Sequence, residues 1–270
     1  AEEHWIEVIN NMGIATFMVD SNWARRKCKK DNNIKKEIPW CAAMNRGMNR
    51  IIDAYGALKL LSNHPRIDPK KIGCIGMSLG ARGCLYLNVK RFKKIWGTPG
   101  IDFAASVPMY PPCNVTFKED DEITDTPIRI HVGELDTYFP VDSCVNYVAR
   151  LKAKGKDVDI KVYPDAHHSF EAKISGKKSM KVKGQSDGRC YYEENHLLPV
   201  AEMASDDVAI ISQVGFEDWY ANASDKDKKK IFKRVKQRHK MGWRIPQFQH
   251  DKSCVSKSNT IAYNKAASEE

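Results

Sequence analysis

The sequence predicts an α/β protein, in which a mostly parallel sheet carries helices on both faces. Strand-type apolar segments alternate with helix-type segments through the first 170 residues, and such alternation is typical of parallel sheets. In addition, the strand-type segment that begins at residue 71 runs directly into a glycine-rich turn and a helix-type segment. A chain of 270 residues is also long enough to bury a sizeable core in one large domain.

The elements follow from hydrophobic spacing and from the residues that stop each run. Apolar residues at helical spacing predict helices at 1–12, about 41–61, 79–89 and 140–154. Short apolar or alternating runs, each ended by glycine, proline or a polar turn, predict strands at 14–19, 71–77, 103–107, 127–132 and 158–163. Beyond residue 172 the pattern weakens, with a predicted loop at 173–190 and helical patterns at 202–214 and 225–240.

The composition excludes some classes of function. The formal net charge is +10, but the excess is spread along the chain, and its densest run, residues 225–240, has apolar residues spaced for one helix face. We interpret this run as a surface helix with a solvated basic face rather than a nucleic-acid or membrane contact. No apolar run reaches membrane-spanning length. The expected partner is therefore a small molecule, and the oligomeric state is left open.

The eight cysteines form no C-x-x-C pair, which argues against a zinc site or a thioredoxin-type motif. We expect Cys74 and Cys84, which lie in apolar sequence, to be buried thiols. Cys113 and Cys144 each follow a predicted strand, and neighbouring parallel strands end at the same edge. A disulfide between them, which would favour an extracytoplasmic location, and two unrelated small residues both remain open.

Residues 76–80 have the pattern G-x-S-x-G, between a strand-type and a helix-type segment. This is the pattern of a nucleophile elbow, in which a strained strand-to-helix turn exposes the serine, here Ser78. Neighbouring side chains must be small for the turn to close. The Leu79 N–H at the helix N-terminus is then placed to stabilise an oxyanion. An ordinary glycine-rich turn is the alternative.

A nucleophilic serine needs a base, and the base needs an acid that orients it. In this architecture the chain order is serine, acid, histidine, each in a loop after a strand. Asp136 follows the strand at 127–132, and His168 follows the strand at 158–163. We therefore expect Ser78, Asp136 and His168 to be the catalytic residues.

Other residues compete for two of these roles. The competing carboxylates are Glu134, Asp142 and Asp165, and the competing base is His167. A helix-dipole interaction explains Asp142, and a turn beside a proline explains Asp165. His168 is preferred because the following Ser-Phe pair would anchor its loop.

On these motifs the chain resembles the dienelactone hydrolase family of α/β-hydrolases over roughly residues 5–170. The resemblance lies in residues 13–21 with Arg25, 72–81, 133–140 and 163–170. It implies an α/β-hydrolase fold, Ser78 as nucleophile, Asp136 as acid and His168 as base, with no metal or cofactor. Residues 110–113 and Cys144 also resemble a subgroup of these hydrolases.

Two departures from the family pattern matter. Enzymes named for dienelactone use a cysteine nucleophile, so Ser78 favours a general serine esterase. The family's first strands and its oxyanion loop are expected before the helix at 1–12. We therefore predict a core at 1–170 that lacks its first strands, and a basic loop and helical extension at 171–270. A second oxyanion donor and the compartment, cytoplasmic or periplasmic and secreted, are not defined by these residues.

The predicted function is hydrolysis of an ester or related acyl bond through an acyl-enzyme intermediate, with a small-molecule ester as substrate. We expect Tyr110 and Met77 to border the substrate pocket. One alternative is a peptidase of the prolyl-oligopeptidase type, which shares the elbow and the order of the triad. The other is a non-catalytic binding protein on a hydrolase scaffold, with residues 225–240 contacting an anionic partner.

Overall fold

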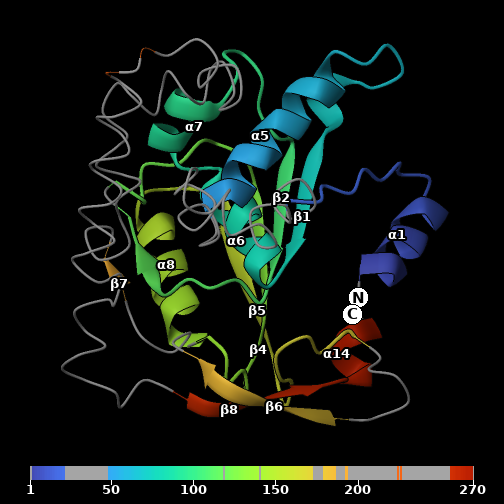
Figure 1. The fold of residues 1–270 in the computed structure, drawn as a ribbon, viewed down its shortest axis with the longest axis vertical. Helices are drawn as coiled ribbons and strands as arrows, with labels where there is room; N and C mark the ends of the chain where they lie inside the picture. Colours follow the sequence, from blue (N-terminus) through green and yellow to red (C-terminus); the bar gives the residue numbers. More distant parts are fainter. Residues whose placement is uncertain are drawn as a thin grey trace.

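The structure is a computed structural model that describes residues 2–21, 48–117, 119–139, 141–172, 179–186, 192–193, 224, 226 and 256–269. Its centre is a four-stranded sheet in the order β1-β2-β4-β5 (Figure 1). The strands are β1 (Gly73–Met77), β2 (Ala105–Met109), β4 (Ile128–Gly133) and β5 (Val158–Tyr163). All three pairings are parallel, so the carboxyl ends of the four strands lie at one edge of the sheet.

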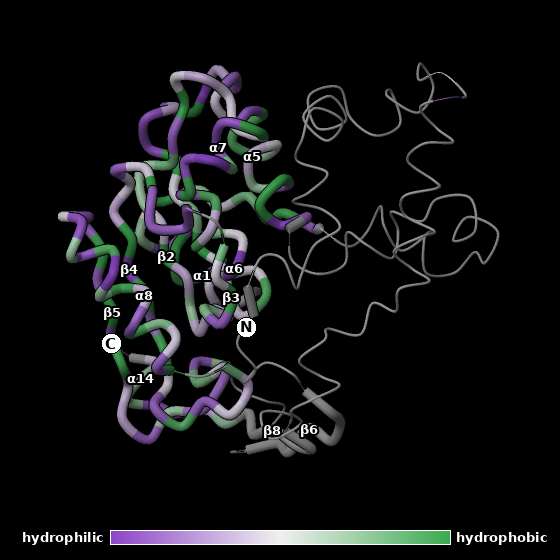
Figure 2. Tube along the Cα trace, turned by 90° about the vertical axis from the view of Figure 1, so that its left-hand side faces the viewer, coloured by the Kyte–Doolittle hydropathy of each residue, from purple (hydrophilic) through white to green (hydrophobic). Residues whose placement is uncertain are grey.

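Helices α5 (Met48–Ser62), α6 (Leu79–Tyr86), α7 (Lys90–Trp96) and α8 (Val141–Ala153) complete this core. Helix α6 packs on β1 and β2 and is covered by α5, and α8 packs on β5. Along the chain, each new strand is added on the same side of the previous one, in the order β1-β2-β4-β5. Because connections between parallel strands are right-handed, helices α6 and α8 lie on the same face of the sheet. The buried residues between them include Leu85, Ile128 and Leu151, each 0% exposed. Hydrophobic and hydrophilic stretches alternate along these elements in Figure 2, as amphipathic elements require.

A second, smaller apolar cluster lies at the carboxyl edge of the sheet. It consists of Met109, Tyr110, Tyr163, Ala166, Phe170 and Ala267, with Trp5 and Met77 packed against it. Trp5 belongs to α1 (Glu2–Asn11) and Ala267 to α14 (Lys265–Glu269). The Asn264 N–H donates to the Phe170 carbonyl at 2.8 Å. Residues from both ends of the described chain therefore pack beside the loops that follow β2 and β5.

The remaining described elements lie outside the central sheet. They are the 3-10 turn η2 (Pro69–Lys71), the pair β3 (Val115–Thr116) and β7 (Tyr192–Glu193), and the antiparallel pair β6 (Ser179–Ser186) and β8 (Ser256–Ala262). None of the helices in these described ranges is long and apolar enough to cross a membrane.

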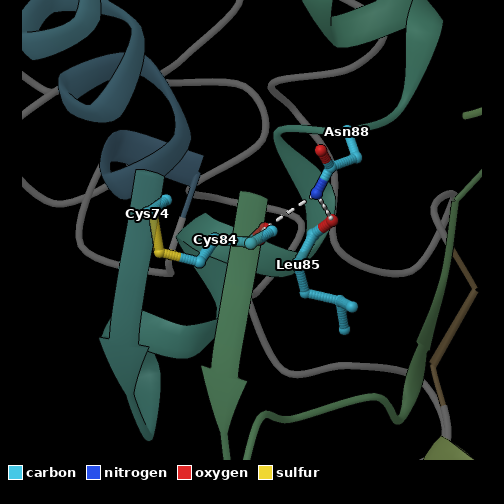
Figure 3. Close-up of a disulfide and its surroundings, with 5 residues drawn as sticks. Cys74, Cys84, Leu85 and Asn88 are labelled. Carbon is cyan, nitrogen blue, oxygen red and sulfur yellow. Dashed lines mark hydrogen bonds between the residues drawn. A yellow bond between two sulfur atoms is a disulfide. The ribbon is translucent and has the colours of Figure 1, made fainter. Parts of the chain in front are cut away.

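Within the part of the chain that the structure describes, two disulfides join elements of the core. Cys113 and Cys144 form a bridge with α-carbons 5.0 Å apart, which decides the open question in favour of the disulfide. The expectation of buried thiols at Cys74 and Cys84 is wrong, because these residues form a second bridge with α-carbons 5.6 Å apart. Figure 3 shows this bridge joining β1 to α6. The cause is the packing of α6 on the face of β1 that carries Cys74, which the apolar composition alone does not specify.

Two segments differ from the sequence-based expectation near the ends of the core. Residues 14–20 have no regular secondary structure, and Phe17 and Met18 are 52% and 62% exposed. The apolar run predicted a strand, but a strand also needs a neighbour to pair with, and none of the described strands supplies one. Residues 179–186, predicted as loop, form β6 because β8 pairs with them. The predicted helices at 202–214 and 225–240 lie outside the described residues, apart from the isolated position 226.

The helix predicted at 79–89 ends earlier, at Tyr86, and α7 begins at Lys90. Figure 3 shows the local cause: the Asn88 side-chain amide donates to the carbonyls of Cys84 and Leu85, at 2.9 and 3.1 Å. These carbonyls belong to the last turn of α6, where helices leave acceptors without intrahelical partners. A buried asparagine therefore ends α6 and allows the chain to turn into α7.

We predict that replacing both Cys113 and Cys144 with alanine lowers the free energy of unfolding by about 3–4 kcal/mol, because the bridge closes a loop with a sequence separation of 31. The Cys74 and Cys84 pair, with a separation of 10, should contribute slightly less, about 3 kcal/mol. Urea unfolding of the oxidised variants measures both values. An unchanged unfolding midpoint, or alkylation of all four cysteines in unreduced protein, would contradict the prediction.

Candidate active site

The structure brings Ser78, Asp136 and His168 together at the carboxyl edge of the sheet. The distance from His168 Nε2 to Ser78 Oγ is 2.9 Å, and the distance from His168 Nδ1 to Asp136 Oδ2 is 2.8 Å. The side chains of His168 and Asp136 are 5% and 2% exposed. With the proton on Nδ1, His168 donates to the carboxylate and accepts the serine proton at Nε2. The imidazole therefore lies within hydrogen-bond reach of both Ser78 and Asp136.

The competing residues are placed elsewhere. The ring nitrogen Nδ1 of His167 lies 3.0 Å from the Leu135 carbonyl oxygen. Glu134 accepts the Asp165 N–H at 3.2 Å, and Asp142 lies in the first turn of α8. Within the described residues, no hydrogen bond joins any of these carboxylates to His168. The geometry favours Asp136 over the other acids and His168 over its neighbour.

Ser78 lies in a strained turn between β1 and α6. Its φ and ψ angles are 51° and −117°, a backbone conformation that residues other than glycine rarely adopt. The Ser78 N–H donates to the Met109 carbonyl at 3.0 Å, which fixes the turn to the neighbouring strand. The turn places the Leu79 N–H in the first turn of α6, where helix N–H groups have no intrahelical partner.

The two glycines of the motif have different roles. A β-carbon on Gly76 would lie 2.6 Å from backbone atoms of Gly80, whereas a β-carbon on Gly80 would meet nothing within 4 Å. The expectation that the turn needs small neighbours therefore holds for Gly76, which must approach the helix backbone closely. At position 80 the turn leaves room for a methyl group.

Asp136 is held by the backbone of its own loop. Asp136 Oδ1 accepts the backbone N–H groups of Tyr138 at 2.7 Å and of Phe139 at 3.1 Å, so Oδ2 is left for His168. This is a local turn in which an aspartate bonds to the backbone that follows it. A β-carbon on Gly133 would lie 2.4 Å from the Ala166 carbonyl oxygen. The loop that carries Asp136, the proposed acid loop, and the loop that carries His168, the proposed base loop, therefore pack backbone against backbone.

Three aromatic rings surround the imidazole of His168. The ring centroids of Tyr110, Tyr138 and Phe139 lie 4.6, 4.7 and 5.4 Å from that of His168. Tyr138 and Phe139 were not predicted from the sequence, although their position directly after Asp136 was an available signal. Such rings restrict the access of water to the imidazole and favour one ring orientation.

The pocket residues proposed from the sequence, Met77 and Tyr110, lie beside Ser78 and His168. Met77 precedes Ser78 and is partly buried, and Tyr110 is 1% exposed. Burial raises the pKa of Tyr110 well above its usual value, and the neighbouring Glu171 carboxylate raises it further. The hydroxyl of Tyr110 therefore stays protonated and acts as a donor. The contact of either residue with substrate stays a prediction.

Two further side chains near the site, Tyr138 and His131, have shifted pKa values with identifiable causes. Burial raises the pKa of Tyr138, and the Asp136 carboxylate adds to the shift. On β4, burial lowers the pKa of His131, with a further contribution from Lys161, so His131 favours its neutral form. Its ring nitrogen Nδ1 lies 2.8 Å from the Tyr163 hydroxyl.

Within the described ranges, no group of three or more histidine, cysteine, aspartate or glutamate side chains is arranged to hold a metal.

The parallel sheet, with the strained Ser78 turn at its carboxyl edge, has the architecture of an α/β-hydrolase fold. The profile of the Dienelactone hydrolase family matches residues 19–189, which is more than half of the chain. The chain therefore belongs to the dienelactone hydrolase family. No curated protein sequence matches the chain.

Solved structures with a similar arrangement include esterases and a peptidase. Esterase 2 of Thermogutta terrifontis is 16% identical, with 46% of this chain and 57% of that chain covered and a TM-score of 0.36. Acyl-protein thioesterase 2 of Zea mays is 18% identical, with 48% and 60% covered and a TM-score of 0.35. Dipeptidyl peptidase 4 of Porphyromonas gingivalis is 15% identical, with 49% and 21% covered and a TM-score of 0.38. The chain thus spans less than two thirds of each of these proteins.

We predict that Gly76→Ala distorts the serine turn and destabilises the protein by about 1–3 kcal/mol, the usual cost of overpacking, because its β-carbon meets the backbone of Gly80. Gly80→Ala is the matched control, since it adds the same methyl group where the structure has room. It should leave stability unchanged or raise it slightly, because alanine favours a helix more than glycine. Thermal unfolding of both variants measures the difference. Equal loss in both would show that Gly76 is not the tight position.

Proposed function

We propose that this protein is a serine hydrolase that cleaves ester or related acyl bonds. The observation that carries the proposal is the position of His168, whose two ring nitrogens face Ser78 and Asp136 at 2.9 and 2.8 Å. A serine hydroxyl is a weak nucleophile until a base accepts its proton. An imidazole oriented by a buried carboxylate is such a base.

The proposed reaction has two stages. In the first, Ser78 Oγ attacks the substrate carbonyl carbon while its proton passes to His168 Nε2. Asp136 stabilises the imidazolium, which then protonates the leaving alcohol as the carbon–oxygen bond breaks. In the second stage, His168 accepts a proton from water, the hydroxide attacks the acyl carbon, and Ser78 leaves with that proton. The acyl group is released as a carboxylic acid.

The negative charge that develops on the carbonyl oxygen needs a donor. The Leu79 N–H is the donor proposed here, because it lies in the first turn of α6 directly after Ser78. Backbone donors at a helix N-terminus combine a hydrogen bond with the favourable end of the helix dipole. The donor is fixed before the substrate binds, so no reorganisation is needed during the reaction.

The substrate proposal rests on the family and on the nucleophile. Membership of the dienelactone hydrolase family supports a small acyl substrate. Ser78 in place of cysteine supports a general serine esterase rather than hydrolysis of dienelactone itself. The two disulfides support an extracytoplasmic location.

We predict that a fluorophosphonate probe labels the protein at Ser78, because the probe reacts with serines activated by a neighbouring base. Mass spectrometry of the labelled peptide identifies the site, and Ser78→Ala should abolish labelling. Labelling that survives this substitution would rule out Ser78 as the nucleophile. Turnover of a p-nitrophenyl ester without cleavage of an aminoacyl amide would separate the esterase from the peptidase alternative, and the reverse result would favour the peptidase.

We predict that Asp136→Asn lowers kcat by about 10⁴, the loss seen when this acid is changed in serine-protease triads. Asp142→Asn is the matched control, since Asp142 lies in the first turn of α8 without contacting His168. His168→Ala should abolish turnover, whereas His167→Ala should retain much of it, because His167 contacts the Leu135 carbonyl instead. Steady-state kinetics on one ester tests all four variants. A large loss in either control would reassign the acid or the base.

A further inference from the structure

Tyr110 has a backbone conformation that is unusual for a bulky side chain. Its φ angle is 40°, in the left-handed region, where a residue with a β-carbon is strained. The other described non-glycine residues with positive φ are Ser78, Glu119, Asp165 and Ser169. Of these, Ser78 is the proposed nucleophile, and Ser169 directly follows the proposed base. Backbone strain in this structure therefore concentrates around the site, and Tyr110 is the one aromatic residue that carries it.

The backbone of Tyr110 is fixed on both sides. Its N–H donates to the His131 carbonyl at 2.6 Å, and the carbonyl of the preceding Met109 accepts the Ser78 N–H at 3.0 Å. Tyr110 is therefore held between the nucleophile turn and β4. This attachment gives its side chain a defined origin from which it reaches the base loop.

The side chain of Tyr110 contacts the base loop through both its ring and its hydroxyl. Its ring lies edge to face with the imidazole of His168, with centroids 4.6 Å apart and an interplanar angle of 64°. Its hydroxyl donates to Glu171 Oε1. Tyr110 and Glu171 are 1% and 2% exposed, so water does not compete for this hydrogen bond. One buried side chain thus holds both His168 and the residue three positions after it.

Glu171 depends on this contact. Its second oxygen, Oε2, is buried and has no hydrogen-bond partner among the described residues. A buried carboxylate without a donor is unfavourable, since it has lost its hydration. Removing the Tyr110 hydroxyl would therefore drive Glu171 toward solvent, and the short segment that joins Glu171 to His168 would move with it.

We propose that Tyr110 is a positioning residue for the catalytic base, which holds the His168 imidazole in place through its ring and through its hydrogen bond to Glu171. Tyr110 acts through His168 and does not itself react with substrate. This inference rests on the proposed function in so far as it concerns turnover. The orientation of His168 can be measured without turnover.

The kinetic test starts from four single variants of the full chain. Tyr110→Phe removes the hydroxyl and keeps the ring, and Glu171→Leu removes the acceptor at similar volume. Glu171→Gln keeps a neutral acceptor for the Tyr110 hydroxyl. Tyr86→Phe is the matched control, because Tyr86 is also fully buried and its hydroxyl donates to the Val115 carbonyl at 2.9 Å, away from the proposed catalytic residues. Thermal unfolding reports the structural cost of each change.

We expect Tyr110→Phe and Glu171→Leu each to lower kcat for a p-nitrophenyl ester by about tenfold or more, with KM little changed, because each breaks one hydrogen bond to a charged group. The double variant should lose no more than either single variant, since both break the same bond. Glu171→Gln should lose less than Glu171→Leu. Tyr86→Phe should lower stability without lowering kcat.

A second readout does not depend on activity. In proton NMR, the His168 Nδ1–H bonded to Asp136 should give a protected low-field signal, identified by its loss in His168→Gln. We expect faster exchange or loss of this signal in Tyr110→Phe and its retention in Tyr86→Phe. An unchanged signal in a folded Tyr110→Phe protein, or equal loss of kcat in Tyr86→Phe, would overturn the proposal. If the wild-type protein hydrolyses no ester, the proposed function fails, and the NMR comparison still decides the role of Tyr110.

Discussion

The parallel pairing of β1, β2, β4 and β5 is the constraint on which the proposed active site depends. Because all four strands run in one direction, the turns that follow them meet at one edge of the sheet. These turns carry Ser78 after β1, Tyr110 after β2, Asp136 after β4 and His168 after β5. The sequence separation of these residues is therefore irrelevant to their distance in space. A reversal of any one strand would move its residue to the opposite edge.

Covalent and close backbone contacts then restrict the turns that the sheet has gathered. The Cys74–Cys84 bridge encloses the segment that contains Ser78, and the Cys113–Cys144 bridge encloses the segment that contains Asp136. The base loop is held by non-covalent contacts instead, namely the approach of Gly133 to Ala166 and the hydrogen bond from Tyr110 to Glu171. Hydrogen bonds in a buried, low-dielectric setting are strong when satisfied and costly when broken. Because of this difference, we expect the loop that carries His168 to be the part of the proposed site most sensitive to the loss of a single hydroxyl group.

Burial gives the site its chemistry as well as its geometry. His168 and Asp136 are almost completely buried, and three aromatic rings surround the imidazole. A carboxylate in such surroundings must be held by donors, and Asp136 receives them from the backbone of Tyr138 and Phe139 as well as from His168. Tyr138 and Phe139 therefore supply backbone donors to Asp136 and aromatic rings to His168. Substitution of their side chains would leave the donors in place and alter only the rings.

The sequence by itself determined the features that depend on local pattern. The strand, turn and helix around Ser78 follow from short-range hydrophobic order and from Gly76. The proposed acid and base, Asp136 and His168, were predicted from polar residues placed after apolar strands. Only the tertiary structure decided which distant groups meet. It paired Cys74 with Cys84, left residues 14–20 without a described strand to pair with, placed Tyr138 and Phe139 against His168, and joined Tyr110 to Glu171. The physical reason is that composition and spacing specify what a segment can bury, whereas the partner of a buried group is set by the packing of other segments against it.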